Sequence, residues 1–512
     1  MSELKDACGV AAVCRRDGQP LAAHVIPDML LDIQNRGQLS AGLTSYQAGR
    51  SQLIDTYKDV GPVSEVFKLS QRAEAESILS RYAGSSAIGH VRYATCGADD
   101  PSYAQPFERH HGRRWKWFSF CFNGNLANYR QLEQTLMRRA NYHIVREGDT
   151  EVFMHYLAYE LRGNRQRSLV DIFSKLSRRI DGAYSMAFLN GMGELAVVRD
   201  PLGFRPLCYS QTQDWFMAAS ESVAISNQGL LDVNPLPPGS VALVREDGTV
   251  KIEQYAEPKR TAHCFFEWVY FANAGSTIEG QSVYLARTRL GQALARQEFV
   301  DTRDAIVVPV PDTAKAAADA MAYALGIPSR EGLLRNRYVG RTFIESNDRA
   351  AKAKRKYTPL REVLDGRKVI LVEDSLVRGT TLQAIIGHMR EWGGAKEIHV
   401  RLTCPPIVAP CCYGIDMSSI GELYAPRFLP KPMEGLLPRR ITNRMAKDVG
   451  ADSLMYLPVE AIPECIGLDR SRLCMACLTG DYPTPWGKRL YRTARSLHKQ
   501  GRKGRVYEYD KT

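Results

Sequence analysis

The sequence predicts an α/β protein of two domains, a first domain rich in β-sheet and a second built on a parallel sheet. Its 512 residues exceed the roughly 250–300 residues at which a single hydrophobic core stops growing. In the first half, short apolar runs such as residues 87–91 and 183–188 are separated by Gly, Asp and Asn, which is typical of strands. From about Asp301 onward, strand and helix patterns alternate, which indicates parallel strands joined by crossover helices.

The boundary between the halves is marked by composition. A Pro-rich stretch at residues 235–239 precedes a final strand pair that ends near Tyr255, and a linker is predicted over residues 256–280. The second half then opens with an apolar strand at residues 305–310 and an Ala-rich helix that runs through Ala324. This strand and helix are the expected first unit of the parallel sheet.

The overall composition is that of an ordinary soluble globular protein, with 44% hydrophobic and 24% charged residues. No apolar stretch approaches the roughly 20 residues that span a bilayer. Residues 1–7 contain no hydrophobic segment of the kind that directs secretion. We therefore expect a cytoplasmic location and no membrane partner.

The formal net charge of +12 fits two classes of partner, nucleic acid or small polyanions. Much of the excess lies in two segments, residues 335–356 and residues 488–511. The first precedes a candidate phosphate loop, which favours a pyrophosphate-containing substrate. The second is interpreted as a solvated or helical end, so we expect no nucleic-acid partner.

The phosphate loop is the stretch VEDSLVRGTT at residues 372–381. It follows an apolar run at residues 368–371 and precedes a helical pattern, so its backbone N–H groups lie at a helix N-terminus, where phosphate is stabilised. Glu373 and Asp374 add acceptors for ribose hydroxyls or ligands for a divalent cation. The interpretation is a sugar-phosphate site; the alternative is an ordinary βα turn with a capping Asp or Ser.

This segment resembles the 5-phosphoribosyl-1-pyrophosphate (PRPP) loop of type I phosphoribosyltransferases. Its amino-acid sequence is similar to that of the glutamine PRPP amidotransferase family. That family usually has Asp-Asp where this chain has Glu373 and Asp374, a change that keeps the charge and lengthens one arm. The resemblance implies that PRPP is bound by Glu373, Asp374, Ser375, Arg378, Gly379, Thr380, Thr381 and Arg341. It implies that Mg²⁺ is held by Thr313, Glu373 and Asp374.

Two further segments resemble parts of the same site. Residues 309–313 (PVPDT) are similar to the pyrophosphate-side loop, and residues 335–343 with residues 352–356 are similar to a flexible catalytic loop. Basic residues that close over a leaving pyrophosphate would stabilise its charge and exclude water. The alternative for the basic residues is a solvated loop.

Cys8 begins the run CGVAAV, and such a cysteine is more often a core residue than a nucleophile. Six motifs nevertheless resemble, in order, those of class II glutamine amidotransferases, whose N-terminal-nucleophile hydrolase fold is an αββα sandwich. They are NRGQ at 35–38, HVRYAT at 90–95, AQPF at 104–107, NGNL at 123–126, GDTE at 148–151 and RDPLGFRPL at 199–207. The resemblance implies a glutaminase domain.

The implied roles form a complete amide-hydrolysis site. If residues 1–7 are removed as a propeptide, the free α-amino group of Cys8, with a pKa of about 8, can act as the base. The side chain of Asn123 and the N–H of Gly124 would stabilise the oxyanion, while Arg92 would bind the glutamine α-carboxylate and Asp149 its α-ammonium. The alternatives are a surface ion pair for Arg92 and a helix N-cap for Asp149.

Twelve cysteines in a cytosolic chain argue against disulfides and for thiolate or metal chemistry. The C-x₂-C at Cys474 and Cys477 suits zinc, an iron–sulfur cluster or a redox pair. Its context resembles the iron–sulfur subgroup of the family, which implies a [4Fe–4S] cluster on these two residues with Cys264 and Cys411. Cys412 is the rival of Cys411, and a Cys₄ zinc site is the alternative to the cluster.

Taken together, the resemblance implies an amidophosphoribosyltransferase, a glutamine-dependent glycosyltransferase that makes 5-phosphoribosylamine, glutamate and pyrophosphate from glutamine and PRPP in the first step of purine synthesis. The competing hypotheses are a PRPP or nucleotide sensor without synthesis, and a glutamine amidotransferase with another acceptor. The expected division is a propeptide at 1–7, a glutaminase domain at 8–255, a phosphoribosyltransferase domain at 256–450 and a C-terminal segment at 451–512. Purine nucleotide feedback and a homotetramer are also implied.

Overall fold

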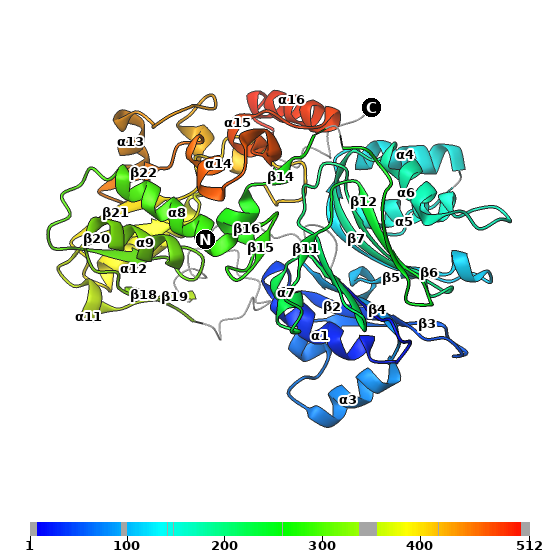
Figure 1. The fold of residues 1–512 in the computed structure, drawn as a ribbon. Helices are drawn as coiled ribbons and strands as arrows, with labels where there is room; N and C mark the ends of the chain where they lie inside the picture. The colour runs from blue at the N-terminus through cyan, green and yellow to red at the C-terminus, as the bar shows by residue number, and fades with distance from the viewer. Residues whose placement is uncertain are drawn as a thin grey trace.

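The computed structural model describes residues 8–93, 100–140, 142–146, 148–258, 260–336, 356–417 and 419–502. The expected propeptide at 1–7 and most of the basic segment, residues 337–355, lie outside this part of the chain. Figure 1 shows a β-sandwich formed by the first half beside an α/β region formed by the second, with the C-terminal helix α16 (Pro485–Lys499) near their seam.

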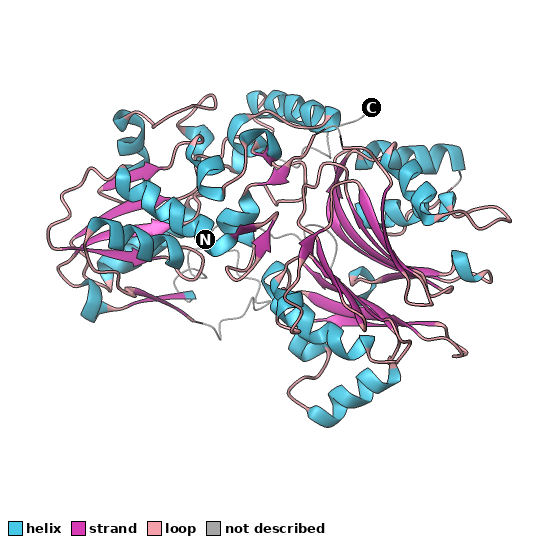
Figure 2. Cartoon of the chain, viewed as in Figure 1, coloured by secondary structure: helices cyan, strands magenta, loops and turns pink. Residues whose placement is uncertain are grey.

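Two antiparallel sheets lie face to face in the first half (Figure 2). The seven-stranded sheet has the order β11 (Asn234–Pro235), β9 (Cys208–Gln211), β10 (Trp215–Ala219), β1 (Gly9–Arg15), β4 (Ser86–Arg92), β2 (Ser40–Tyr46) and β3 (Ile54–Val60). The six-stranded sheet has the order β13 (Val250–Gln254), β12 (Ser240–Val244), β8 (Leu195–Arg199), β7 (Gly182–Asn190), β6 (Phe118–Leu126) and β5 (Phe107–Arg109).

Helices cover the outer face of each sheet. The seven-stranded sheet packs against α1 (Ala22–Asp32), α2 (Val63–Val66), α3 (Arg72–Arg81) and α7 (Val223–Ser226). The six-stranded sheet packs against α4 (Tyr129–Ala140), α5 (Asp149–Glu160) and α6 (Leu169–Ser177). The four layers confirm the predicted αββα sandwich.

Strand β1 shows why the run after Cys8 is continuously apolar. Val10, Ala12 and Cys14 pack between the two sheets, whereas Ala11 and Val13 pack against the helical layer. Successive side chains point to opposite faces of a strand, so a strand covered on both sides needs apolar residues at every position. Strand β1, at the start of the first domain, is therefore packed on both faces in the middle of the sandwich.

The linker crosses the seam and carries a buried charge network. It contains β14 (His263–Cys264), the π-helix η4 (Glu267–Phe271), β15 (Thr277–Ile278) and β16 (Gln281–Ser282). Arg36 lies 2.6 Å from both Glu221 and Glu267, and Arg205 lies 3.4 Å from Glu267; all four side chains are at most 2% exposed. Buried charges are tolerated only when paired, so this network fixes the linker against the sandwich.

The second half has a four-stranded parallel sheet, as predicted. Its order is β17 (Ala305–Pro309), β20 (Lys368–Glu373), β21 (Glu397–Leu402) and β22 (Ser453–Tyr456). Helices α8 (Val283–Arg296) and α9 (Lys315–Leu325) pack on one face, and α12 (Thr380–Glu391) and α13 (Arg439–Val449) pack on the other. Because β22 follows residue 450, the sheet takes its last strand from the segment expected at 451–512.

Short elements complete the described chain. The ribbon β18 (Leu333–Arg335) and β19 (Tyr357–Pro359) joins the two ends of residues 337–355. The others are α11 (Arg361–Leu364), α14 (Ala461–Ile466), β23 (Leu473–Cys474), α15 (Ala476–Thr479) and the 3₁₀ helices η1 (Gln34–Arg36), η2 (Pro101–Tyr103), η3 (Arg114–Lys116), η5 (Ile420–Glu422), η6 (Ala425–Arg427) and η7 (Arg470–Arg472).

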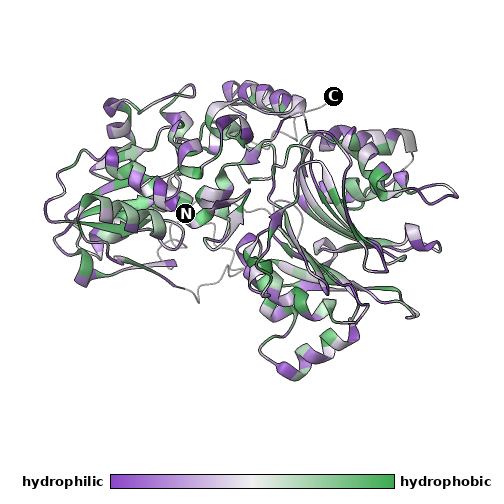
Figure 3. Ribbon diagram, viewed as in Figure 1, coloured by the Kyte–Doolittle hydropathy of each residue, from purple (hydrophilic) through white to green (hydrophobic). Residues whose placement is uncertain are grey.

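Apolar residues are concentrated in the sheets and on the inner sides of the helices, as the colouring of Figure 3 shows. Among the helices in the described ranges, none combines the length and apolarity needed to cross a bilayer.

Candidate functional site

The first site is a cavity of about 530 Å³ in the sandwich. Four of the five predicted glutaminase residues line it: Cys8, which precedes β1, Arg92 at the end of β4, Gly124 on β6 and Asp149 at the start of α5. These residues come from four separate elements, so the αββα fold itself brings them together. Arg92 is only 7% exposed, which excludes the surface ion pair.

Asn123, the fifth residue, does not line the cavity but lies beside it on β6, with its side chain fully buried. Its Nδ2 is 3.5 Å from the Ser220 hydroxyl, a distance at the limit of hydrogen bonding, and that hydroxyl accepts the N–H of Val10 at 3.0 Å. The amide is therefore held next to the strand that begins after Cys8.

The Cys8 thiol is half-buried and contacts the Tyr93 carbonyl at 3.8 Å. Burial raises the pKa of this thiol above its ordinary value, while the contact with Tyr93 and the charges of Arg92 and Arg205 act in the opposite direction. A thiol with a raised pKa needs a base to become a nucleophile at neutral pH. The cavity thus holds a candidate nucleophile that requires activation.

Asp149 has the electrostatics of a cation-binding group. Its Oδ2 accepts the backbone N–H of Leu126 at 2.9 Å, so the carboxylate faces β6. Burial raises its pKa to about 6, although that hydrogen bond acts to lower it. A partly buried carboxylate with a raised pKa gains most from a positively charged partner, such as an amino group.

The second site is the loop between β20 and α12, and the predicted order of strand, loop and helix is confirmed. Gly379 adopts a positive φ of 90° directly before α12. A Cβ at this position would lie 2.6 Å from the ring of Tyr424, so both the conformation and the space require glycine. The first N–H groups of α12, which directly follow this loop, have no partner within the helix.

The acidic pair at the end of β20 is deeply buried, with Glu373 3% and Asp374 2% exposed. Oε2 of Glu373 and Oδ2 of Asp374 have no hydrogen-bond partner within the described part of the chain. Burial and the neighbouring Asp374 charge raise the pKa of Glu373, and burial raises the pKa of Asp374 to about 6. Two adjacent, unpaired carboxylate oxygens are the donor set expected of a site for a divalent cation.

The other predicted PRPP-binding residues in the described chain follow the acidic pair in the loop and at the start of α12. Ser375 donates to Asp374 at 2.6 Å, and Thr380 and Thr381 open α12. Arg378, by contrast, donates to Glu422 at 2.5 Å and to the Asp416 carbonyl at 3.0 Å, so its guanidinium is bound to a neighbouring loop. Arg341 lies outside the described residues.

The pyrophosphate-side loop adjoins the base of the predicted catalytic loop. Thr313 lies in the turn between β17 and α9. The hydroxyl of Tyr357 on β19 donates to the Pro311 carbonyl at 3.3 Å, and Arg335 on β18 pairs with Asp312 at 2.5 Å. Both ends of residues 337–355 are thus anchored beside the turn that contains Thr313.

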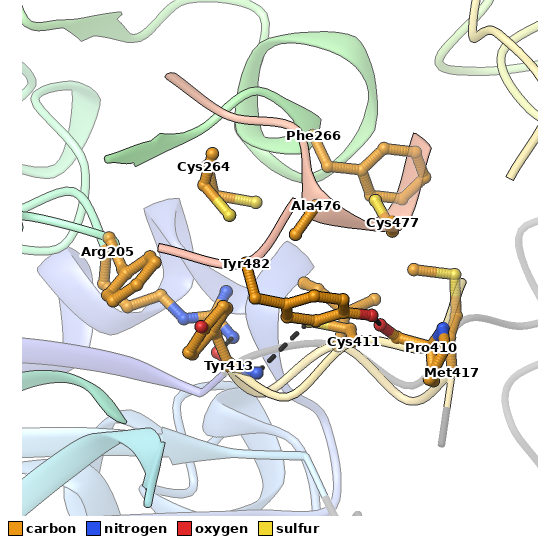
Figure 4. Close-up of a pocket in the computed structure, with 13 residues that line it drawn as sticks. Arg205, Cys264, Phe266, Pro410, Cys411, Tyr413, Met417, Ala476, Cys477 and Tyr482 are labelled. Atoms are coloured by element: carbon orange, nitrogen blue, oxygen red, sulfur yellow. Dashed lines mark hydrogen bonds between the residues drawn. The ribbon is translucent and has the colours of Figure 1, made fainter. Parts of the chain in front are cut away.

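The third site is a cavity of about 420 Å³ at the seam, drawn in Figure 4. All four predicted cysteines line it: Cys264 on β14, Cys411 in a loop, Cys474 on β23 and Cys477 on α15. The parallel pairing of β14 with β23 places Cys264 beside Cys474. Cys412 is absent from the lining residues, which favours Cys411 over its rival.

Burial raises the pKa of each of the four thiols above its ordinary value. Arg205 also lines the cavity and donates to the Tyr413 carbonyl at 2.8 Å. In the described residues, no group of three or more His, Cys, Asp or Glu side chains is arranged to hold a metal ion. The four cysteines line a common space.

The six motifs leave out three residues that line the first cavity, apart from Cys8. They are Tyr103, Phe122 and Arg146. Tyr103 stacks under the Arg92 guanidinium at 5.4 Å, and Arg146 lies three positions before Asp149. The one sequence signal for Arg146 is its position two residues before the GDTE motif, which contains Asp149.

Comparisons with known proteins agree with this arrangement. Residues 90–227 match a glutamine amidotransferase domain, and residues 282–405 match a phosphoribosyl transferase domain. The amidophosphoribosyltransferase of Methanothermobacter thermautotrophicus is 36% identical over 94% of this chain and 96% of its own length. That of Pyrococcus horikoshii is 37% identical over 94% and 97%.

Solved structures give the same result. The glutamine PRPP amidotransferase from B. subtilis, complexed with ADP and GMP, superposes with a TM-score of 0.80 at 33% identity, covering 94% of this chain and 98% of its own. The chain therefore belongs to the amidophosphoribosyltransferase family, glutamine-dependent enzymes of purine biosynthesis that use PRPP.

Proposed function

We propose that this enzyme hydrolyses glutamine at Cys8 and uses the released ammonia to displace pyrophosphate from PRPP beside Glu373 and Asp374. The observation that carries the proposal is the convergence of Cys8, Arg92, Gly124 and Asp149 on one cavity from four elements. A PRPP or nucleotide sensor would not need these four side chains together. An enzyme with another acceptor would not need the loop that precedes α12.

The glutaminase step follows from the chemistry of the first cavity. Removal of residues 1–7 gives Cys8 a free α-amino group, which takes the thiol proton as sulfur attacks the side-chain amide. Asn123 and the N–H of Gly124 stabilise the oxyanion, and the same amino group returns its proton to the departing ammonia. Arg92 binds the α-carboxylate of glutamine, and Asp149 binds its α-ammonium. The positive charge of that ammonium would lower the raised pKa of Asp149.

The transferase step requires charge neutralisation and orientation. Mg²⁺, held by Glu373, Asp374 and Thr313, would neutralise pyrophosphate as it leaves. Ser375, Gly379, Thr380 and Thr381 would bind the 5-phosphate at the N-terminus of α12, and Arg341 would close over the substrate. Arg378 would act by fixing the loop, since its guanidinium is bound to Glu422. Neutral ammonia then attacks the anomeric carbon through an enclosed passage.

For the third cavity we propose a [4Fe–4S] cluster on Cys264, Cys411, Cys474 and Cys477. The four cysteines line one cavity, so a single group could bind all of them. Four cysteine thiolates are the ligand set of a [4Fe–4S] cluster, and also that of a structural zinc site. When bound, the cluster supplies a covalent joint between three distant segments, and Arg205 offsets part of its negative charge.

Several broader features belong to the same proposal. The division at residue 255 follows β13, the last strand of the sandwich. We place the enzyme in the cytoplasm, as a homotetramer under purine nucleotide feedback. The structure of the B. subtilis relative, which was solved in complex with ADP and GMP, supports nucleotide binding.

Iron and acid-labile sulfide analysis of anaerobically purified protein tests the proposed cluster. An active, colourless, iron-free protein would exclude it and leave zinc as the alternative.

The glutaminase assignment is tested by removing its nucleophile. Cys8→Ala should abolish glutamine-dependent pyrophosphate release, while release driven by added ammonium should stay within about twofold of wild type. Intact-mass measurement of the active wild-type enzyme should show a chain that starts at Cys8. Glutamine-dependent activity in Cys8→Ala, or full activity with residues 1–7 retained, would contradict the mechanism.

A further inference from the structure

The Cys8 cavity contains a second guanidinium besides Arg92. Arg146 lines the same cavity as Cys8, Arg92 and Asp149, and its side chain is 34% exposed. Its guanidinium lies 5.5 Å from the centre of the Phe107 ring, which also lines the cavity. The aromatic face gives the arginine a fixed apolar support.

The backbone of Arg146 is held in place while its charge remains weakly paired. The two carboxylate oxygens of Glu151 accept the N–H groups of Val145 at 2.8 Å and Arg146 at 2.6 Å. Glu151 therefore already accepts strong hydrogen bonds, and the Arg146 Nη1 lies 3.9 Å away, at the limit for an ion pair. The buried Nε of Arg146 has no hydrogen-bond partner in the described ranges.

A buried donor without a partner is uncommon and points to a missing acceptor. The charges of the cavity define that acceptor. Asp149 accepts one backbone N–H through Oδ2, whereas both carboxylate oxygens of Glu151 accept backbone N–H groups, and Arg92 and Arg146 are the cations. One carboxylate that is less occupied by donors and two guanidiniums match a ligand with an ammonium and a carboxylate, as in an α-amino acid.

Arg146 also lies on the appropriate side of the cavity. The charges of Arg92 and Arg205 are the ones that lower the pKa of the Cys8 thiol. Arg146 instead adjoins Phe107 and Glu151, close in sequence to Asp149. This side is where the α-carbon of a glutamine would lie when its amide reaches Cys8.

We propose that Arg146 shares the α-carboxylate of glutamine with Arg92 and thereby selects amide donors that carry this group. The inference rests on the assignment of the Cys8 cavity to glutamine. It adds a specificity-determining residue that is not part of the six motifs.

The test compares glutamine with 4-aminobutanamide, which has the same amide and amino groups but no α-carboxylate. In Arg146→Gln, the KM for glutamine should rise about 10- to 100-fold, as expected for the loss of hydrogen bonds to a charged group. Cleavage of 4-aminobutanamide should keep its wild-type kcat/KM. Arg146→Lys should fall between wild type and Arg146→Gln because it keeps the charge but not the planar fork.

Arg138→Gln, on the exposed side of α4, is the matched control and should behave as wild type. An unchanged KM for glutamine in Arg146→Gln would overturn the inference. An equal loss with both amides would also overturn it, because it would assign Arg146 to packing alone. Glutamine-dependent activity in Cys8→Ala would instead reject the glutamine cavity, so the two failures are distinguishable.

Discussion

The two candidate sites both contain carboxylates with raised pKa values, but Asp149 is partly exposed whereas Glu373 and Asp374 are buried. Asp149 stands alone, with one oxygen anchored to the Leu126 N–H and a pKa raised to about 6. Glu373 and Asp374 are neighbours, and each has an oxygen without a hydrogen-bond partner in the described chain. A single carboxylate calls for one positive charge, whereas an adjacent pair calls for two. The difference fits the proposed ligands, an ammonium at Asp149 and a divalent metal at the acidic pair.

The largest effect on the reaction rate should come from a substitution in the acidic pair Glu373 and Asp374. Asp374→Asn removes a charge from the proposed Mg²⁺ and PRPP site, so the rate should fall roughly 10²–10³-fold, the range measured when a single transition-state stabiliser is removed. The loss should be equal with glutamine and with ammonium, measured as pyrophosphate release.

Glu373→Asp is the control for this prediction. It keeps both charges and gives the Asp-Asp pair usual in the family, so most activity should remain. A glutamine-specific loss in Asp374→Asn would show that the pair acts on the first site instead.

A second large effect should come from the charge network that joins the two halves. Glu267→Gln leaves Arg36 and Arg205 with one fewer buried partner, which should lower the free energy of unfolding by about 3–5 kcal/mol. Denaturant titration measures this change. Glu331→Gln removes an exposed ion pair with Lys315 and should leave the denaturation midpoint unchanged. Equal denaturation midpoints for Glu267→Gln and Glu331→Gln would mean that the buried charge network does not stabilise the contact between the two halves.

A substitution of Asp149 should reduce activity less than a substitution in the Glu373–Asp374 pair. It should reduce only the activity that depends on glutamine. Asp149→Asn loses the charge that faces the α-ammonium, so kcat/KM for glutamine should fall about 10- to 100-fold. The ammonium-driven rate should not change, because it bypasses this cavity. A parallel loss with ammonium would remove the distinction between the two sites.

The smallest effect concerns pH. The folded protein holds the Asp149 proton more tightly than an ordinary carboxyl, with a pKa of about 6 against 3.8. Ionisation of Asp149 therefore destabilises the fold above about pH 6, and this destabilisation disappears below pH 3.8.

Consequently, Asp149→Asn should be more stable than wild type at pH 7, by roughly 1–3 kcal/mol, and equal to it near pH 4. The wild-type KM for glutamine should rise as pH falls below about 6, because protonated Asp149 cannot pair with an ammonium. Thermal melts and steady-state kinetics measure the two changes. Identical melting curves at pH 7 would show that Asp149 is not destabilising.

The two sites also differ in how far the sequence predicts them. The PRPP loop is one contiguous strand, turn and helix, so apolar periodicity and two acidic residues indicate its position without tertiary information. The Cys8 cavity depends on sheet order, which places β1 beside β4 and β6 across the sandwich. Motif resemblance supplied Arg92 and Asp149, but local pattern could not reveal Arg146.

The cysteine cavity shows the same limit. Its C-x₂-C is visible in the sequence, but the pairing of β14 with β23, which places Cys264 beside Cys474, is a contact between segments about 200 positions apart. The place of β22 in the parallel sheet, within the segment expected at 451–512, could not be predicted from the sequence for a similar reason. The short strand β22 belongs to the sheet because of its pairing with β21, which composition does not encode.

The β14–β23 pairing also constrains when the cavity can exist. Cys264 emerges from the ribosome long before Cys474 and Cys477, and only the later segment completes the lining. A nascent chain can fold its sandwich early, since domains form as units during synthesis. The lining of the cysteine cavity, however, is complete only once the chain has been made past residue 477, so a group bound by all four cysteines would enter late in synthesis or after it.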